Sequence, residues 1–92
     1  MISKATAKFW KSYRELPADV RKRAKEAYLI FQNDPWYPSL YFKRVHSSLP
    51  VYSARITKDY RAVGILKDEK IVWFWVGSHS DYNTLLKQMK ST

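Results

Sequence analysis

The chain has 92 residues, of which 46% are hydrophobic and 16% aromatic, which is enough for the core of one small domain spanning residues 1–92. Without cysteine it has neither a disulfide framework nor a thiolate metal site, and it shows no apolar stretch long enough to span a bilayer and no signal peptide. Lys and Arg number 17 against 8 Asp and Glu, a formal charge of +9 that favours a nucleic-acid or acidic-protein partner. We therefore expect a cytoplasmic protein with no membrane contact.

Two amphipathic helices are predicted first, over Ala5–Leu16 and Ala18–Gln32. Each has an apolar stripe at helical spacing and many Lys and Arg residues elsewhere. Pro17 lies between them, since proline is disfavoured inside a helix but accepted in its first turn. The result would be a helical hairpin with solvated basic faces, and phosphate contact by those faces is the alternative.

Four strands are expected next, over Leu40–His46, Val51–Ile56, Tyr60–Leu66 and Ile71–Val76. The third is apolar on both faces apart from Arg61, which indicates a central strand. Short connections, such as the charged turn at residues 67–70, favour antiparallel pairing. A short helix over Asp81–Met89, with Ser80 as a candidate cap, would follow. The predicted class is α+β, with the helical hairpin packed on an antiparallel β-sheet and a short C-terminal helix.

The residues capable of chemistry are basic and aromatic. Metal-ligand spacing, a glycine-rich phosphate loop, a nucleophile elbow and paired carboxylates are all missing from the sequence. Arg55 and Arg61 interrupt apolar strands, and guanidinium groups bind phosphate through a fork of donors. Lys43 and Arg44, on the neighbouring predicted strand, would widen this patch.

His79 and Tyr82 complete the candidate site, because histidine exchanges protons near neutral pH and tyrosine stacks on bases or donates a hydrogen bond. The whole set suits RNA cleavage without metal or cofactor, in which the 2′-hydroxyl of the RNA is the nucleophile. Simpler interpretations stay open: the arginines would only pair with Asp59 or Asp81, the histidine would cap the last helix, and the tyrosine would belong to the core.

A family resemblance is carried by three segments, PSLYFKRV, YSARITKDYRAVG and IVWFWVGSHSDYNTLL, which follow the helical hairpin in this order. They resemble the RelE/ParE superfamily of toxins from bacterial type II toxin–antitoxin modules, over nearly the whole chain. The resemblance implies a compact antiparallel sheet with the hairpin packed against it. It also implies a cognate antitoxin, often acidic in the segment that binds the toxin.

Two activities occur among the proteins that the chain resembles. RelE-like members are ribosome-dependent endoribonucleases that cut mRNA, and ParE-like members inhibit DNA gyrase. The resemblance therefore implies an mRNA endoribonuclease, a gyrase inhibitor without chemistry of its own, or a member that has lost toxicity. By position, four residues of this chain resemble the family's phosphate-binding basic residues: Lys43, Arg44, Arg55 and Arg61. Two others resemble its C-terminal acid–base or stacking residues: His79 and Tyr82.

Two departures from the family pattern are visible. Members often begin with a strand, but only Met1–Ser3 precede the first predicted helix, so that strand would be absent or very short. Some ribonuclease members place a glutamate base on the strand equivalent to Leu40–His46, which contains no Glu here. The base would then be His79 or a lysine such as Lys43, or the protein would not be a nuclease.

Overall fold

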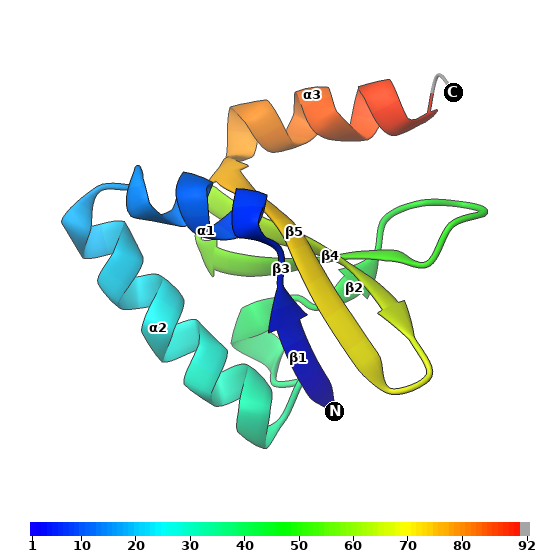
Figure 1. The fold of residues 1–92 in the computed structure, drawn as a ribbon, viewed down its shortest axis with the longest axis horizontal. Helices are drawn as coiled ribbons and strands as arrows, with labels where there is room; N and C mark the ends of the chain where they lie inside the picture. The colour runs from blue at the N-terminus through cyan, green and yellow to red at the C-terminus, as the bar shows by residue number, and fades with distance from the viewer. Residues whose placement is uncertain (91–92) are drawn as a thin grey trace.

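A computed structural model describes residues 1–90 as two N-terminal helices, a five-stranded sheet and a C-terminal helix (Figure 1). In chain order the elements are β1 (Ile2–Ala5), α1 (Ala7–Arg14), α2 (Ala18–Asn33), the 3₁₀ helix η1 (Pro38–Leu40), β2 (Lys43–Arg44), β3 (Val51–Thr57), β4 (Tyr60–Lys67), β5 (Lys70–Ser78) and α3 (His79–Lys90). The strand order is β1-β5-β4-β3-β2, with β1 parallel to β5 and the other pairs antiparallel. The predicted α+β class is confirmed, as is the central position of the third predicted strand.

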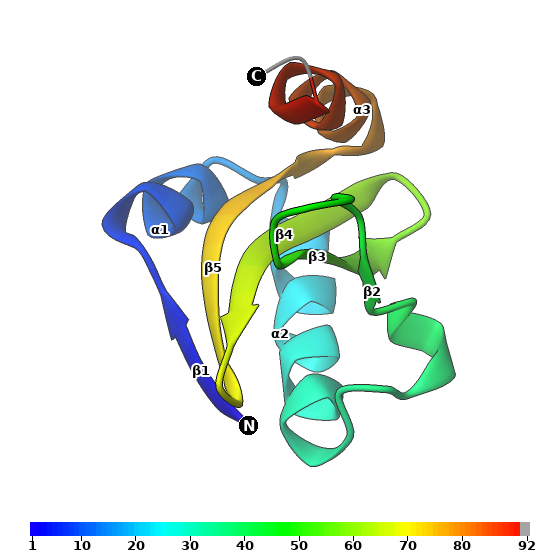
Figure 2. The ribbon, with the colours of Figure 1, turned by 90° about the vertical axis from the view of Figure 1, so that its right-hand side faces the viewer.

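Tight turns join the three long strands. Asp68 and Glu69 both have positive φ, 52° and 63°, as a two-residue turn between β4 and β5 requires to match the twist of the strands. The turn between β3 and β4 is equally short, because Thr57 and Tyr60 are register partners across it. The result is a strongly twisted ribbon of β3, β4 and β5 (Figure 2).

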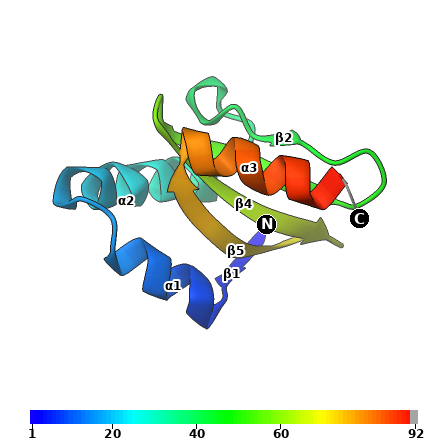
Figure 3. The same cartoon turned by 90° about the horizontal axis from the view of Figure 1, so that it is seen from above.

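Both faces of the sheet are covered, by different helices. One core joins α1 and α2 to the sheet and contains Phe31, Phe42 and Trp73, whose rings contact one another edge to face. A second core lies under α3, where Tyr82 packs with Val51 and Val63. Figure 3 shows α3 lying across the sheet, apart from α1 and α2. None of the helices within residues 1–90 is long and apolar enough to cross a membrane.

The strand Leu40–His46 predicted from sequence is wrong except at Lys43–Arg44. Pro38 starts the 3₁₀ helix, and Tyr41 then adopts the left-handed conformation, with φ 44°, which no strand continues through. On the other side, the ring Nδ1 of His46 accepts the backbone N–H groups of residues 48 and 49, and this local bonding folds the chain into a loop.

The ends of the helices also differ from the prediction. Thr6 caps α1 by accepting the N–H of Phe9, so the helix begins two residues later than predicted. Ala5 belongs to β1, a strand of four residues that was expected to be absent or very short. At the other end α3 starts at His79, and the hydroxyl of Ser78, not that of Ser80, accepts the N–H of the third helical residue. Parallel pairing of β1 with β5 was not predicted.

Candidate functional site

Two arginines face each other across the middle of the sheet. Arg55 of β3 and Arg61 of β4 are register partners, and Gly77 of β5 is the partner of Arg61 on its other side. Facing residues in neighbouring strands point to the same side of a sheet, and so do residues an even number of positions apart in one strand. Val51 of β3 and Val63 of β4 pack under α3 and lie an even number of positions from Arg55 and Arg61, so the two arginines are on the side of α3. The pair therefore lies in the open part of the α3 face, and both residues are partly exposed.

Arg61 is held in place by backbone carbonyls. Its Nη1 donates to the carbonyl oxygens of Thr57 at 2.6 Å, Tyr60 at 3.0 Å and Lys58 at 3.3 Å, all in the turn between β3 and β4. Its Nε and Nη2 have no hydrogen-bond partner within residues 1–90, so two nitrogens, with three N–H groups between them, are left for an anion. Burial lowers the pKa of Arg61 below its usual value and the nearby charge of Arg55 lowers it further, against opposing contributions from Tyr82 and Asp59.

Neither arginine is neutralised by a carboxylate in the part of the chain that the structure describes. The one ion pair within residues 1–90 joins Arg23 to Glu26 on the exposed face of α2. The alternative in which Arg55 or Arg61 pairs with an aspartate is therefore not realised. Two cations side by side without a counter-ion repel each other, and an anion such as phosphate would relieve that repulsion.

Tyr82 lies close to this pair but is buried. Only 6% of its surface is exposed, and its hydroxyl donates to Ser53 Oγ at 3.1 Å. A ring in this position has no face free for a base, so the structure matches the interpretation of Tyr82 as a core residue. Its role is to dock α3 on β3, next to Arg61.

His79 is exposed at the first position of α3. Its backbone N–H donates to the carbonyl of Asp59 at 2.6 Å, and its ring lies 5.7 Å from the ring of Tyr82. The turn that holds Arg61 therefore also holds His79. Within residues 1–90 the ring's one hydrogen-bond contact is between Nδ1 and the amide of Asn83, at 3.2 Å, and Nε2 has no partner there. The Asn83 amide therefore orients the ring of His79.

The two basic residues of β2 have different surroundings. Lys43 is exposed and is the register partner of Ser53, which places it on the same face as Arg55, two residues further along β3. Arg44 is the partner of Tyr52, which alternation places on the opposite face, and its Nε donates to the carbonyls of residues 46 and 49. Lys43 therefore extends the arginine pair, whereas Arg44 stabilises a loop.

One residue of this neighbourhood was missed by sequence reasoning. Tyr41 is 60% exposed, and the guanidinium carbon of Arg55 lies 5.3 Å from the centre of its ring, a cation–π contact. Tyr41 was placed inside the predicted strand Leu40–His46, and a strand gives no reason to expect one of its aromatic side chains to be part of a site. Its only sequence signal is the preceding Pro-Ser-Leu, which is typical of a turn rather than a strand.

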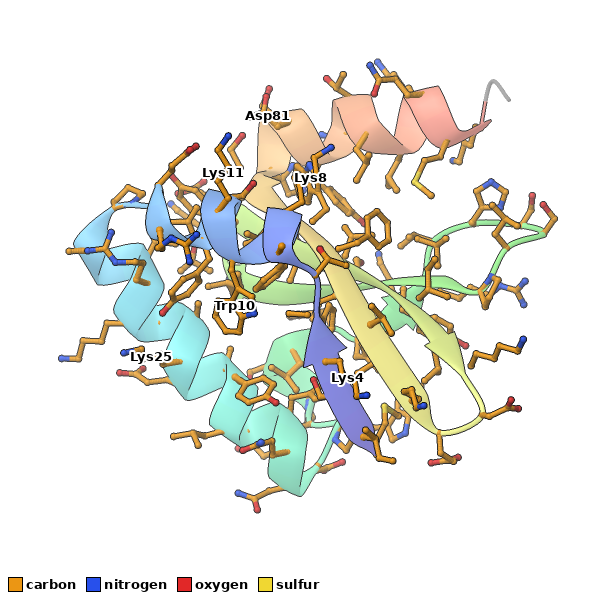
Figure 4. The ribbon with its side chains drawn as sticks, in the orientation of Figure 1. Lys4, Lys8, Trp10, Lys11, Lys25 and Asp81 are labelled. Carbon is orange, nitrogen blue, oxygen red and sulfur yellow. The ribbon has the colours of Figure 1, made fainter. Side chains whose placement is uncertain are left out.

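An apolar groove of about 420 Å³ lies on the other side of the sheet, between α1 and α2. Its lining includes Trp10, Tyr28 and Leu29, which are 47%, 40% and 61% exposed. Figure 4 shows Trp10 on the side of α1 that faces α2, with Lys8 and Lys11 on the opposite side of the helix. No group of side chains within residues 1–90 is arranged to hold a metal ion.

The chain resembles known toxins in sequence and in fold. A family model described as a ParE-like toxin domain matches residues 18–84. Among solved structures, the RelB–RelE antitoxin–toxin complex of Methanococcus jannaschii aligns with a TM-score of 0.73 at 19% identity, covering 89% of this chain and 96% of that chain. The YoeB/ParE toxin of Agrobacterium tumefaciens gives 0.66 at 15% identity, with 86% and 99% covered, and the isolated E. coli RelE toxin gives 0.64 at 18%, with 96% and 97% covered. No curated protein sequence matches the chain.

Proposed function

The chain belongs to the family of ParE-like toxin domains, within the RelE/ParE superfamily, and on this basis we propose that it is a cytoplasmic toxin that cleaves mRNA on the ribosome without a metal ion. The observation that carries the proposal is the Arg55–Arg61 pair, two adjacent cations without a carboxylate partner in residues 1–90, on a face left partly open to solvent. Such a pair suits a phosphodiester better than a neutral ligand.

In the proposed reaction the 2′-hydroxyl of a nucleotide attacks the phosphorus atom that follows it. A base removes the proton of that hydroxyl, the bond from phosphorus to the 5′-oxygen breaks, and an acid protonates the leaving oxygen. The products are a 2′,3′-cyclic phosphate and a 5′-hydroxyl end. Negative charge rises on the phosphoryl oxygens in the transition state, where Arg55 and the free donors of Arg61 would stabilise it.

His79 is the proton-transfer group of this proposal, because its side chain is exposed, its Nε2 has no hydrogen-bond partner within residues 1–90, and its ring is oriented by Asn83. Residues 40–46 contain no Glu, so the second proton-transfer group would be Lys43, on the same face of the sheet. Arg44 would contribute to RNA binding only through the positive field. Tyr82 would act through the position of α3 and of the His79 ring, not by contact with RNA.

The proposed partner of the toxin is a cognate antitoxin with an acidic segment. A formal charge of +9 attracts such a segment, and the groove between α1 and α2 offers apolar side chains bordered by Lys4 and Lys25. An amphipathic segment with carboxylates beside its apolar face would fit this surface. The chain is similar in fold to RelE in a RelB–RelE complex, which supports the presence of an antitoxin.

The function can be tested by expressing the wild type and the Arg61→Ala and His79→Ala variants in bacteria and mapping message ends. We expect growth arrest and truncated messages with the wild type only, while both variants accumulate as folded protein. Arg23→Ala, which changes an arginine on α2, is the matched control and should stay toxic. Retained toxicity in folded Arg61→Ala protein would contradict the proposal.

Inhibition of DNA gyrase is the second candidate, because the matching family model is described as ParE-like. A gyrase inhibitor would need the basic surface but no proton transfer. In that case His79→Ala would stay toxic, and the arrested cells would contain damaged DNA and intact messages.

A further inference from the structure

Tyr41 has an unusual backbone conformation between two buried residues. The residues on either side of it, Leu40 and Phe42, are 2% and 7% exposed and anchor the chain in the core, so the side chain between them points outward. Its backbone has φ 44° and ψ 40°, a left-handed conformation that side chains larger than those of Gly, Asn and Asp seldom adopt. Its N–H donates to the carbonyl of Pro38 at 3.2 Å. Strained residues of this kind are concentrated at binding and active sites.

The ring extends the row of the two arginines. The pairing of β2 with β3 ends at Lys43, opposite Ser53, and Arg55 lies two residues further along β3, where it faces Arg61. The cation–π contact of 5.3 Å between the Arg55 guanidinium and the ring places Tyr41 beside Arg55. Tyr41, Arg55 and Arg61 therefore form a continuous line, with an exposed aromatic ring next to two cations.

We propose that Tyr41 is a base-stacking subsite for single-stranded RNA, next to the phosphate site formed by Arg55 and Arg61. Arg55 covers one face of the ring, and the exposed remainder would take one base of a nucleotide whose phosphate is held by the arginines. Basic grooves with aromatic platforms bind single strands in this way, because every base has a flat face to stack. This subsite assumes the proposed function, and Tyr41 takes the stacking role that a buried Tyr82 cannot.

The test compares two probes: a short single-stranded oligonucleotide with 2′-O-methyl groups, which cannot be cleaved, and an abasic oligonucleotide with the same number of phosphates. Tyr41→Leu keeps an apolar side chain with the same backbone strain but removes the ring, and Tyr41→Phe keeps the ring. We expect the leucine variant to bind the base-containing probe about 5- to 150-fold more weakly and the abasic probe as the wild type does. The phenylalanine variant should bind both probes as the wild type does.

Salt dependence provides a second measurement. Tyr41→Leu should leave the slope of log affinity against log salt unchanged, whereas Arg55→Gln should reduce it by roughly 0.7 for each phosphate group that the variant no longer neutralises. Equal losses for both probes with Tyr41→Leu would overturn the inference, since they would mean that the ring only orients Arg55. Unchanged binding of both probes would overturn it as well. A wild type that binds neither probe would instead contradict the phosphate site of Arg55 and Arg61, the observation on which the proposed function rests.

Discussion

The hydroxyl of Tyr82 donates to Ser53 Oγ at 3.1 Å, and this bond fastens α3 to β3 inside the second core. The same helix begins with His79, whose ring contacts that of Tyr82. The ring of Tyr82 therefore lies between the core and the proposed proton-transfer group, while its hydroxyl stabilises the docking of α3 without taking part in the chemistry.

Tyr82→Phe should lower stability and leave cleavage intact. Removing one partner of a buried hydrogen bond costs about 1 kcal/mol, or roughly 4–8 °C in Tm for a domain of this size. Cleavage by the folded variant should equal that of the wild type. The double variant with Ser53→Ala should lose less stability than the sum of the two single variants, because neither partner is then left unsatisfied. A fully folded Tyr82→Phe protein without activity would show that the hydroxyl has a chemical role.

Arg61→Lys should be inactive although the charge is kept. The guanidinium donates to three carbonyls through Nη1 and leaves two further nitrogens for phosphate, which a single ammonium group cannot do at once. We expect the rate of cleavage to fall by about 100-fold or more, as for loss of a group that stabilises transition-state charge. Arg23→Lys, on α2, is the control and should keep its rate. An active Arg61→Lys variant would mean that only charge matters at this position.

Sulfate should stabilise the wild type through the arginine pair. The adjacent charges repel each other, which is one reason why the pKa of Arg61 is lowered, and a bound dianion removes that repulsion. Sulfate also stabilises proteins in general by exclusion from their surface, so the informative quantity is the difference between variants. The Tm of the wild type should rise more with sulfate than with chloride at equal ionic strength. The Arg55→Gln and Arg61→Gln variants should lose this excess, the additional rise in Tm with sulfate. Arg23→Gln should retain it, and an excess that survives all three changes would exclude an anion site here.

Gly77→Ala should disturb the site through packing. A Cβ atom at this position would lie 2.8 Å from the ring of Trp75, closer than real contacts allow, so the ring or the strand has to move. Overpacking of this kind costs about 1–3 kcal/mol. Because Gly77 is the register partner of Arg61, we expect weaker sulfate binding as well as a lower Tm. The same Tm and sulfate response as the wild type would show that the site tolerates the shift.

The sequence predicted the central part of the fold because its signals are local. Apolar, β-branched strand segments and two-residue turns determine residues 51–78, and those elements were placed within two residues of their observed ends. β1 could not be predicted in the same way, since Ile2–Ala5 forms a strand only by pairing with β5, about 70 residues away in the chain.

The candidate site was predictable in part for the same reason. Arg55 and Arg61 stood out because cations interrupt apolar strands, and their pairing follows from a short turn. Burial of Tyr82 depends on how α3 docks, and exposure of Tyr41 depends on a left-handed residue, so neither has a local signal. Tertiary packing, not composition, decided which aromatic side chain is accessible.

The most direct test of the central claim is primer extension on a defined mRNA, with the purified protein added either to a bacterial translation extract or to the bare RNA in the presence of a metal chelator. We predict cuts within the message only when ribosomes translate it, ending in a 2′,3′-cyclic phosphate, and none with Arg61→Ala. Messages left intact in the translation extract by a protein that still arrests growth would contradict the account and direct the search to DNA gyrase.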